Sequence, residues 1–219
     1  MTGSLVVVGT GPGKAELMTP ATRAAIAGAT DLVGYGPYLD RVPVCATQQR
    51  HASDNRVELE RARLALSLAA AGRQVVVVSG GDPGVFAMAA AVFEAVEAGD
   101  PMWRELDIRI EPGVTAMLAA AAEVGAPLGG DFCAISLSDN LKRWATVERR
   151  LKAAADADFV IALYNPASNA RPHQLGRAFE LLGTCKSLDT PVLFVRAAGS
   201  AEARVVVATL GSADPAIAD

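Results

Sequence analysis

The stretch from Val75 to Phe86, Val-Val-Val-Val-Ser-Gly-Gly-Asp-Pro-Gly-Val-Phe, decides the fold class. Its valines predict a strand over Val75–Ser79 that is apolar on both faces, as in a sheet covered by helices on both sides. Beyond the glycine- and proline-rich loop, apolar residues recur at helical spacing and predict a helix that ends at Gly99; they are Val85, Ala89, Val92 and Val96. A strand, a loop and a returning helix form the repeating unit of an α/β fold.

Similar apolar runs alternate with helical stretches along the whole chain, so we predict an α/β fold throughout. The other predicted strands are Leu5–Val8, Ile108–Ile110, Phe132–Ser136, Phe159–Leu163 and Val192–Val195. After the last of these, a turn at Gly199-Ser200 leads to Arg204–Leu210, which predicts an antiparallel hairpin. The run Gly125-Ala-Pro-Leu-Gly-Gly130 predicts a linker between an N-terminal domain, residues 1–124, and a C-terminal domain, residues 131–219.

Local signals place the helices between these strands. Thr19-Pro20 predicts the N-cap and first residue of a helix that ends by Gly28. Asn55 with Glu58 predicts a capping box for the next helix. Apolar faces predict two later helices, the first through Trp144, Val147 and Leu151 and the second through Leu175, Phe179 and Leu182.

The composition argues against several classes of protein. Of the 219 residues 51% are hydrophobic, and the formal net charge of −4 offers no general basic field for nucleic acid or a membrane surface. The three cysteines lie far apart in sequence and predict neither a metal site nor a disulfide framework. No basic leader precedes the first strand, and no apolar run reaches the roughly 18 residues of a membrane span, so we expect a cytoplasmic protein.

The first predicted strand also runs into a glycine-rich loop, Gly9-Thr-Gly-Pro-Gly-Lys14, at the position where α/β proteins often bind nucleotides. A dinucleotide fingerprint would need glycine in place of Lys14, and Pro12 removes a backbone donor that a phosphate cradle would use. A Walker A loop would need glycine at Val8 and a hydroxyl side chain at Ala15. A loop for another ligand and a plain turn remain open.

Two further loops follow strands in the same half of the chain. Asp82, in the first of them, is suited either to bind a ligand hydroxyl or amine or to cap the following helix. The second loop, Glu111-Pro-Gly-Val-Thr-Ala116, places Thr115 as the expected N-cap of a helix. Because open α/β sheets bind small molecules at the carboxyl ends of their strands, the three loops predict one common site.

Together these segments resemble the signatures of the tetrapyrrole methylases, nearly end to end. Val8–Gly13 with Leu17–Pro20 is similar to that family's opening loop, Ser79–Ala89 to its cofactor loop and Pro112–Ala116 to its third signature. Three other stretches resemble the subgroup that methylates precorrin-3B in cobalamin synthesis: Gly34-Tyr-Gly-Pro-Tyr38, Gly130–Lys142 and Ala162–Pro166.

The resemblance implies an enzyme of two α/β domains, with S-adenosylmethionine held in the cleft between them, largely by backbone groups, and released as S-adenosylhomocysteine. It also implies a homodimer. The implied cofactor contacts are Pro12, Gly80, Gly81, Asp82, Val85, Phe86, Thr115, Ala116, Tyr164, Asn165 and Ala198.

The implied acceptor is precorrin-3B, methylated at C17 while its ring contracts to precorrin-4. Ring contraction needs proton transfers, for which the candidates are Asp82, His51 and Asp139. The sequence around His51, between Arg50 and Ala52, favours an exposed loop position over this role. The acceptor carries many carboxylates, which cationic side chains bind. The candidates for that role, each also explained by a solvated helix face, are Arg56, Arg61, Lys142, Arg143 and Arg171.

The chain departs from the family pattern in a few places. Arg143 stands where proline is common, Ser200 where arginine is usual, and the chain ends at Asp219 before the closing strand segment that we expect. Three alternatives stay open: a cobalt-containing acceptor such as cobalt-precorrin-3, a same-fold methyltransferase for RNA or protein, and a non-catalytic nucleotide-binding module. Binding of S-adenosylhomocysteine without a response to ATP or NAD would argue against the last.

Overall fold

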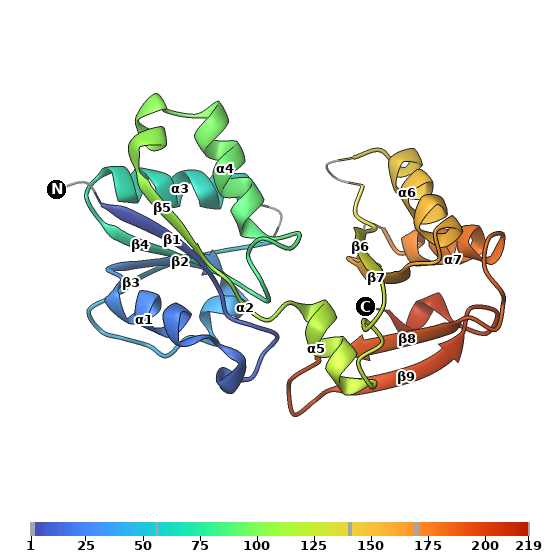
Figure 1. Cartoon of the computed structure of the whole chain (residues 1–219). Helices are drawn as coiled ribbons and strands as arrows, with labels where there is room; N and C mark the ends of the chain where they lie inside the picture. The colour runs from blue at the N-terminus through green and yellow to red at the C-terminus, as the bar shows by residue number, and fades with distance from the viewer. Residues whose placement is uncertain (1–2, 56, 140–141, 169–170, 219) are drawn as a thin grey trace. The chain divides into compact units, whose positions relative to one another are not determined.

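The computed structural model describes residues 3–55, 57–139, 142–168 and 171–218, and it confirms the predicted α/β fold (Figure 1). The chain divides into two compact units, Met1–Ala119 and Ala120–Asp219, and each has its own hydrophobic core. The division falls within helix α5 (Ala116–Glu123), ahead of the predicted linker 125–130, and the domain boundary itself stays a prediction.

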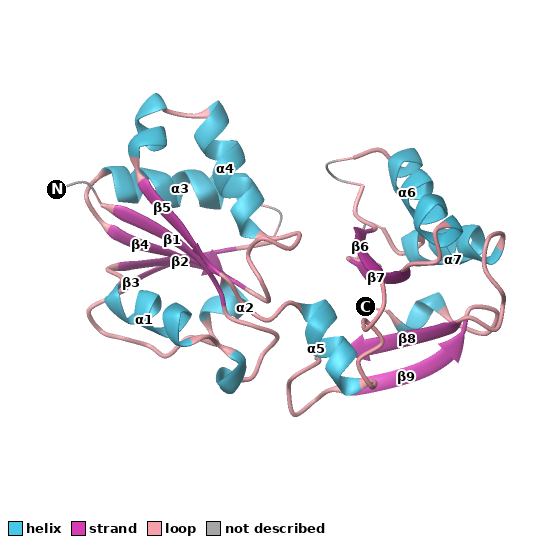
Figure 2. Ribbon diagram, in the orientation of Figure 1, coloured by secondary structure: helices cyan, strands magenta, loops and turns pink. Residues whose placement is uncertain are grey.

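Five parallel strands form the sheet of the first unit, in the order β3-β2-β4-β1-β5 (Figure 2). They are β1 (Ser4–Gly9), β2 (Asp31–Tyr35), β3 (Gln49–Ser53), β4 (Gln74–Ser79) and β5 (Asp107–Glu111). The sequence analysis predicted β1, β4 and β5 but not β2 and β3. The edge strand β3 is polar and half exposed, so it carries no apolar signal.

Helices cover both faces of this sheet, as the apolar strands predict. They are α1 (Pro20–Gly28), α2 (Gly36–Leu39), α3 (Glu58–Ala70) and α4 (Met88–Ala98), with the short 3₁₀ helices η1 (Ala15–Leu17) and η2 (Pro101–Glu105). Leu5 and Val7 of β1 join the core formed with α3 and α4, whereas Val6 and Val8 join the core formed with α1 and α2. The alternation of side chains along β1 therefore fills two cores at once.

Two of the predicted helix starts are wrong, and one is confirmed. Thr19 caps α1, and its hydroxyl accepts a hydrogen bond from the Thr22 amide at 3.1 Å. Asn55 does not form a capping box, because Val57 occupies the N-cap of α3 and makes no side-chain cap bond. Val85 lies in the loop before α4 rather than in the helix, which begins at Met88.

The second unit combines a parallel strand pair with an antiparallel hairpin. β6 (Phe132–Ser136) pairs with β7 (Val160–Tyr164), and β8 (Pro191–Arg196) pairs with β9 (Arg204–Thr209) as the predicted hairpin. The amphipathic helices α6 (Trp144–Asp156) and α7 (Gln174–Gly183) bury their apolar faces in one core with β6, and η3 (Pro215–Ile217) follows β9. In the described part of the chain, no helix is long and apolar enough to cross a membrane.

Candidate functional site

The loops that follow β1, β4 and β5 meet at the carboxyl edge of the first sheet, where these three strands are neighbours. Gly11 and Gly81 exchange a pair of backbone hydrogen bonds, with N···O distances of 3.1 Å and 2.9 Å. This bridge joins the first glycine loop to the second. The structure therefore brings together the segments that the sequence predicted to share a site.

The contact between the loops depends on glycine. A Cβ at Gly9 would lie 2.5 Å from the Gly81 carbonyl oxygen and 2.7 Å from the Gly113 nitrogen. A Cβ at Gly113 would lie 2.2 Å from the same Gly81 oxygen, and Gly81 has a φ of +61°, which L side chains rarely adopt. Three backbones are thus packed where no side chain fits.

Asp82 ties the second loop to the third. One carboxylate oxygen accepts a hydrogen bond from the Gly84 amide at 2.8 Å, and the other accepts one from the Gly113 amide at 3.0 Å. Asp82 does not cap α4, which begins at Met88. Of the two roles that the sequence left open, helix capping is therefore excluded, and the carboxylate acts on the loops themselves.

Two threonines that the sequence analysis did not select hold the first loop in place. The Thr10 hydroxyl donates to the Ser79 carbonyl at 3.0 Å, and the Thr22 hydroxyl donates to the Gly9 carbonyl at 3.2 Å. Both side chains are buried. Threonine within a glycine-rich loop was a usable signal for Thr10, whereas Thr22 lies on α1 and only the fold reveals its role.

Phe86 adopts an unusual backbone conformation next to this junction. Its φ is +52°, and its side chain is 50% exposed although it is large and apolar. Non-glycine residues in the left-handed region are uncommon and concentrate at functional sites. Phe86 was predicted as a cofactor contact, and its geometry is compatible with that role.

The first glycine loop does not have the geometry of a nucleotide-binding loop. In the dinucleotide and Walker A motifs, the glycine turn opens directly into a helix whose N-terminus faces the phosphates. Here η1 and the Thr19 cap separate Gly13 from α1, which begins at Pro20. This separation argues against the nucleotide-binding alternative.

His51 does not belong to the junction, and the loop position expected for it is wrong. It lies within β3, in register with Val33 of β2, and its Nε2 is 2.9 Å from an oxygen of Asp31 at the start of β2. Its ring is therefore directed toward the amino end of the sheet, opposite the glycine loops. This geometry does not support a role for His51 in proton transfer.

The partner of His51, Asp31, is a fully buried carboxylate. Arg73 donates to its second oxygen at 2.7 Å, and the Thr30 hydroxyl donates to the same oxygen at 2.7 Å. Burial alone would raise the pKa of Asp31, but the hydrogen bonds from Arg73, Thr30 and His51 outweigh it and lower the pKa to about 2. The network is a stabilising one.

Arg61 is committed to contacts inside the first unit. It is 5% exposed, and its guanidinium donates to the Ser53 hydroxyl at 2.8 Å, the Asp54 carbonyl at 2.7 Å and the Met88 sulfur at 3.3 Å. Burial lowers the pKa of the Arg61 guanidinium. These contacts explain Arg61 without an acceptor carboxylate. Arg56, the neighbouring candidate, lies outside the described residues.

In the second unit, three of the remaining candidates lie close together. Arg171 Nε is 3.9 Å from a carboxylate oxygen of Asp139, and the Lys142 ammonium donates to the Ser138 carbonyl at 2.8 Å. Burial lowers the pKa of Lys142, and the nearby Arg150 and Arg171 cations lower it further, against the opposing effect of Asp139. Arg143 is exposed at the N-cap of α6. The arrangement is a local cationic cluster in an otherwise acidic chain.

The predicted cofactor contacts of this unit follow strands. Asn165 comes after β7 with a φ of +53°, and its side-chain amide donates to the Ser136 hydroxyl at 2.9 Å. Ala198, after β8, is buried and lies between Ala197, whose φ is +49°, and Gly199. Tyr164 is the last residue of β7. Non-glycine residues with a positive φ therefore follow β7 and β8, as Phe86 does in the loop after β4.

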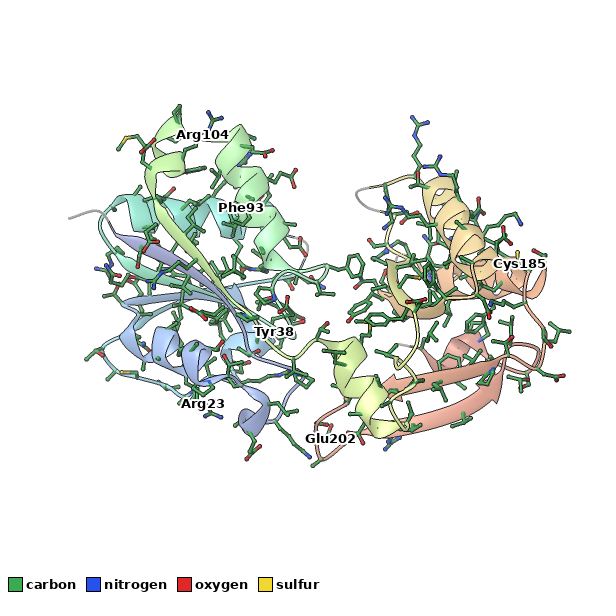
Figure 3. The ribbon with its side chains drawn as sticks, viewed as in Figure 1. Arg23, Tyr38, Phe93, Arg104, Cys185 and Glu202 are labelled. Atoms are coloured by element: carbon green, nitrogen blue, oxygen red, sulfur yellow. The ribbon has the colours of Figure 1, made fainter. Side chains whose placement is uncertain are left out.

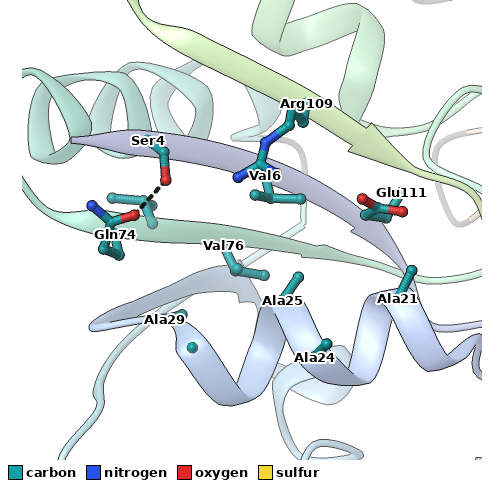
Figure 4. Close-up of a pocket in the computed structure, with 12 residues that line it drawn as sticks. Ser4, Val6, Ala21, Ala24, Ala25, Ala29, Gln74, Val76, Arg109 and Glu111 are labelled. Atoms are coloured by element: carbon teal, nitrogen blue, oxygen red, sulfur yellow. Dashed lines mark hydrogen bonds between the residues drawn. The ribbon is translucent and has the colours of Figure 1, made fainter. Parts of the chain in front are cut away.

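A separate pocket of 430 Å³ lies between α1 and the strands β1, β4 and β5 (Figure 4). Alanines of α1 leave it open, and a hydrogen bond of 2.6 Å between the Ser4 hydroxyl and the Gln74 side chain lies at its edge. None of the predicted site residues lines it. Among the described residues, no group of three or more His, Cys, Asp or Glu side chains is placed to hold a metal ion.

The fold and the junction define a class: an α/β protein in which three glycine-containing loops meet at the carboxyl ends of a parallel sheet. The chain belongs to the tetrapyrrole (corrin/porphyrin) methylases, whose family model matches residues 4–214.

Comparison with individual proteins shows which members of the family this chain is similar to. A precorrin-3B C(17)-methyltransferase of Sinorhizobium sp is 61% identical over 219 residues, which are 100% of this chain and 86% of that protein. A probable cobalt-factor III C(17)-methyltransferase of Salmonella typhimurium is 41% identical over 211 residues, covering 96% of this chain and 86% of that protein. The crystal structure of the methyltransferase CobJ matches with a TM-score of 0.96 and 53% identity, over 99% of this chain and 90% of that chain.

Proposed function

We propose that this chain is an S-adenosylmethionine-dependent methyltransferase that methylates precorrin-3B at C17, with contraction of the ring to precorrin-4, in cobalamin synthesis. The observation that carries the proposal is the junction of Gly9, Gly81 and Gly113, in a chain 61% identical over its full length to a relative with that name. A junction of this kind suits a ligand that is recognised through the main chain.

The residues at the junction fit the methyl donor. Gly81 lets the second loop approach the first closely, Asp82 fixes the loop, and Phe86 offers an exposed ring beside them. When bound, S-adenosylmethionine supplies an activated methyl group. The protein's own contribution is then to orient donor and acceptor and to exclude water, which can account for most of the acceleration. The strand exits at Tyr164, Asn165 and Ala198 remain proposed contacts.

For the acceptor, we propose the cluster of Lys142, Arg171 and Asp139 as the carboxylate-binding group. Two cations close together offer charge-assisted hydrogen bonds to peripheral carboxylates, and Asp139 holds Arg171 in position. The double variant Lys142→Ala with Arg171→Ala should raise the KM for precorrin-3B about 100-fold or more, since each of the two lost charged contacts is worth about 1.5–3 kcal/mol. Affinity for S-adenosylhomocysteine should not change. An unaltered KM would exclude this assignment.

A cobalt-containing acceptor is the second candidate, because the Salmonella relative is named for cobalt-factor III. Incubation with each acceptor, followed by mass measurement of the product, separates the two. The acceptor whose product carries one additional methyl group is the substrate, provided that the other acceptor is unchanged.

Calorimetric titration with S-adenosylhomocysteine tests the methyltransferase proposal without an unstable acceptor. We expect saturable binding at one site, and no heat of binding with ATP or NAD. Gly81→Val should abolish binding, because Gly81 requires a positive φ and lies within the junction. Folded wild-type protein that does not bind would contradict the proposal.

We also infer a homodimer and a cytoplasmic location, both of which rest on the family resemblance. Sedimentation equilibrium of the purified chain tests the first, and fractionation of the source cells tests the second.

A further inference from the structure

The stretch Gly34-Tyr-Gly-Pro-Tyr38, one of the segments that resemble the subgroup described above, has no role in the site described so far. It forms the end of β2 and most of α2, and β2 is the neighbour of β4 in the sheet. It therefore reaches the carboxyl edge beside the cofactor loop. Figure 3 shows Tyr38 near that edge.

Tyr38 contacts the cofactor loop directly. A Cβ placed on Gly80 would lie 2.7 Å from Cζ and 3.1 Å from Oη of the Tyr38 ring. Position 80 therefore requires glycine, because the Tyr38 ring occupies the space that a side chain would need. The ring therefore packs directly against the loop predicted to hold the methyl donor.

The position of Tyr38 is fixed by its neighbours in α2. Leu39 is buried against Gly34, where an added Cβ would lie 3.1 Å from its Cγ. The Arg50 guanidinium, from β3, donates to the carbonyls of Leu39 at 2.8 Å, Val42 at 2.8 Å and Pro43 at 2.6 Å. These bonds fasten the segment that follows Tyr38 to the sheet, and the Tyr38 ring itself packs against the core formed with α1 and α2, so the ring is held in place before any ligand arrives.

The surroundings of Tyr38 combine aromatic rings with a positive charge. Tyr35 meets Tyr38 edge to face, with ring centroids 5.4 Å apart and planes at 89°. The guanidinium carbon of Arg41 lies 5.4 Å from the centroid of the Tyr38 ring, and Arg41 is exposed. Both tyrosines keep part of their surface open to solvent. A flat ring system that carries carboxylates at its rim suits such a surface.

We propose that Tyr38 and Arg41 form part of the acceptor site: the Tyr38 ring contacts the face of the tetrapyrrole beside the methyl donor, and Arg41 binds one of its carboxylates. This inference rests on the proposed function and extends it to the β2 side of the sheet edge. It gives the first unit a substrate-binding surface that the candidates Arg56 and Arg61 were expected to supply. Tyr38 then contributes to selection among acceptors as well as to packing against Gly80.

Kinetics of Tyr38→Leu, Tyr38→Phe and Arg41→Gln with precorrin-3B test the proposal, alongside calorimetry with S-adenosylhomocysteine. We expect Tyr38→Leu and Arg41→Gln each to raise the KM for the acceptor about 10-fold, which is near the upper limit for one aromatic contact and near the lower limit for one charged contact. Tyr38→Phe should restore the wild-type KM, because the ring is retained. Affinity for S-adenosylhomocysteine should stay within about twofold in all three variants, because the substituted side chains are proposed to contact the acceptor and not the cofactor.

Arg63→Gln is the matched control, because Arg63 is an exposed arginine on α3 and its loss changes the net charge equally. A Tyr38→Leu protein with weaker S-adenosylhomocysteine binding and a normal acceptor KM would overturn the inference, leaving Tyr38 as a support for Gly80 alone. If Tyr38→Leu does not fold, a KM for Arg41→Gln equal to that of Arg63→Gln overturns it. If the wild type forms no product with precorrin-3B and none with the cobalt-containing acceptor, the proposed function is contradicted, and the inference with it.

Discussion

At the scale of single residues, Asp82 acts through both of its carboxylate oxygens, which accept the amides of Gly84 and Gly113. A carboxylate fixed by two backbone donors is well placed to hold loops and poorly placed to exchange protons. The geometry thus favours a positioning role over the predicted role in proton transfer. The two roles differ in which kinetic constant they control.

Asp82→Asn separates the two roles. The oxygen of the asparagine side chain can still accept one hydrogen bond, but its NH₂ group cannot accept the hydrogen bond from the Gly113 amide. The contact between the second and third loops should therefore weaken. We expect the affinity for S-adenosylhomocysteine to fall about 10-fold, equivalent to about 1.4 kcal/mol. Calorimetry measures the affinity. Asp100→Asn is the control, because Asp100 accepts one amide, that of Met102, at the start of η2. Loss of turnover with unchanged affinity would show that Asp82 transfers a proton instead.

At the scale of elements, the site depends on the packing of three strand exits without side chains. Gly113→Ala should disrupt it, because the new Cβ would lie 2.2 Å from the Gly81 oxygen and backbone would have to move. Overpacking of this kind costs about 1–3 kcal/mol, so the thermal midpoint should fall and S-adenosylhomocysteine affinity with it. Gly28→Ala, at the end of α1 with no atom within 4 Å, should retain both. Equal behaviour of the two variants would contradict the role of the junction.

The elements also show how far sequence patterns lead. The runs at β1, β4 and β5 and the faces of α6 and α7 were predicted because burial imposes a regular apolar spacing. β3 was not predicted and the start of α3 was misplaced, because a polar edge strand and a helix without a side-chain cap leave no reliable local signal. His51 was misplaced for the same reason, since its environment depends on the unpredicted pairing of β3 with β2. The glycine loops were predicted as a common site, but the link from Asp82 to Gly113 spans 31 residues and only the fold reveals it.

At the scale of the whole molecule, the junction and the network around Asp31 occupy opposite ends of the same sheet. Loops at the carboxyl edge carry the proposed chemistry, whereas Asp31, Arg73 and His51 join the starts of β2 and β4 to the edge strand β3. Substitutions can therefore change the stability of the fold without changing ligand binding. A variant in the network should weaken folding without altering the affinity of the native protein for its ligand.

Asp31→Asn tests this division through the dependence of stability on pH. The folded pKa of Asp31, about 2, lies below the unfolded value near 4. The stabilisation is therefore complete above about pH 4 and is lost as the pH falls toward 2. Denaturant titrations should show a difference in unfolding free energy between wild type and Asp31→Asn that shrinks by about 2 kcal/mol as the pH falls from about 5 to about 2.

The control is Asp107→Asn, because Asp107 makes an exposed ion pair with Arg109 at 3.4 Å, which should contribute little at any pH. Its difference from wild type should stay small and nearly constant from pH 5 to about pH 2. Affinity of folded Asp31→Asn for S-adenosylhomocysteine at neutral pH should match the wild type, since the network and the glycine loops lie at opposite ends of the strands. A constant difference between wild type and Asp31→Asn across this range would show that the carboxylate is not stabilised by its partners, and a loss of affinity would show that the two ends of the sheet are coupled.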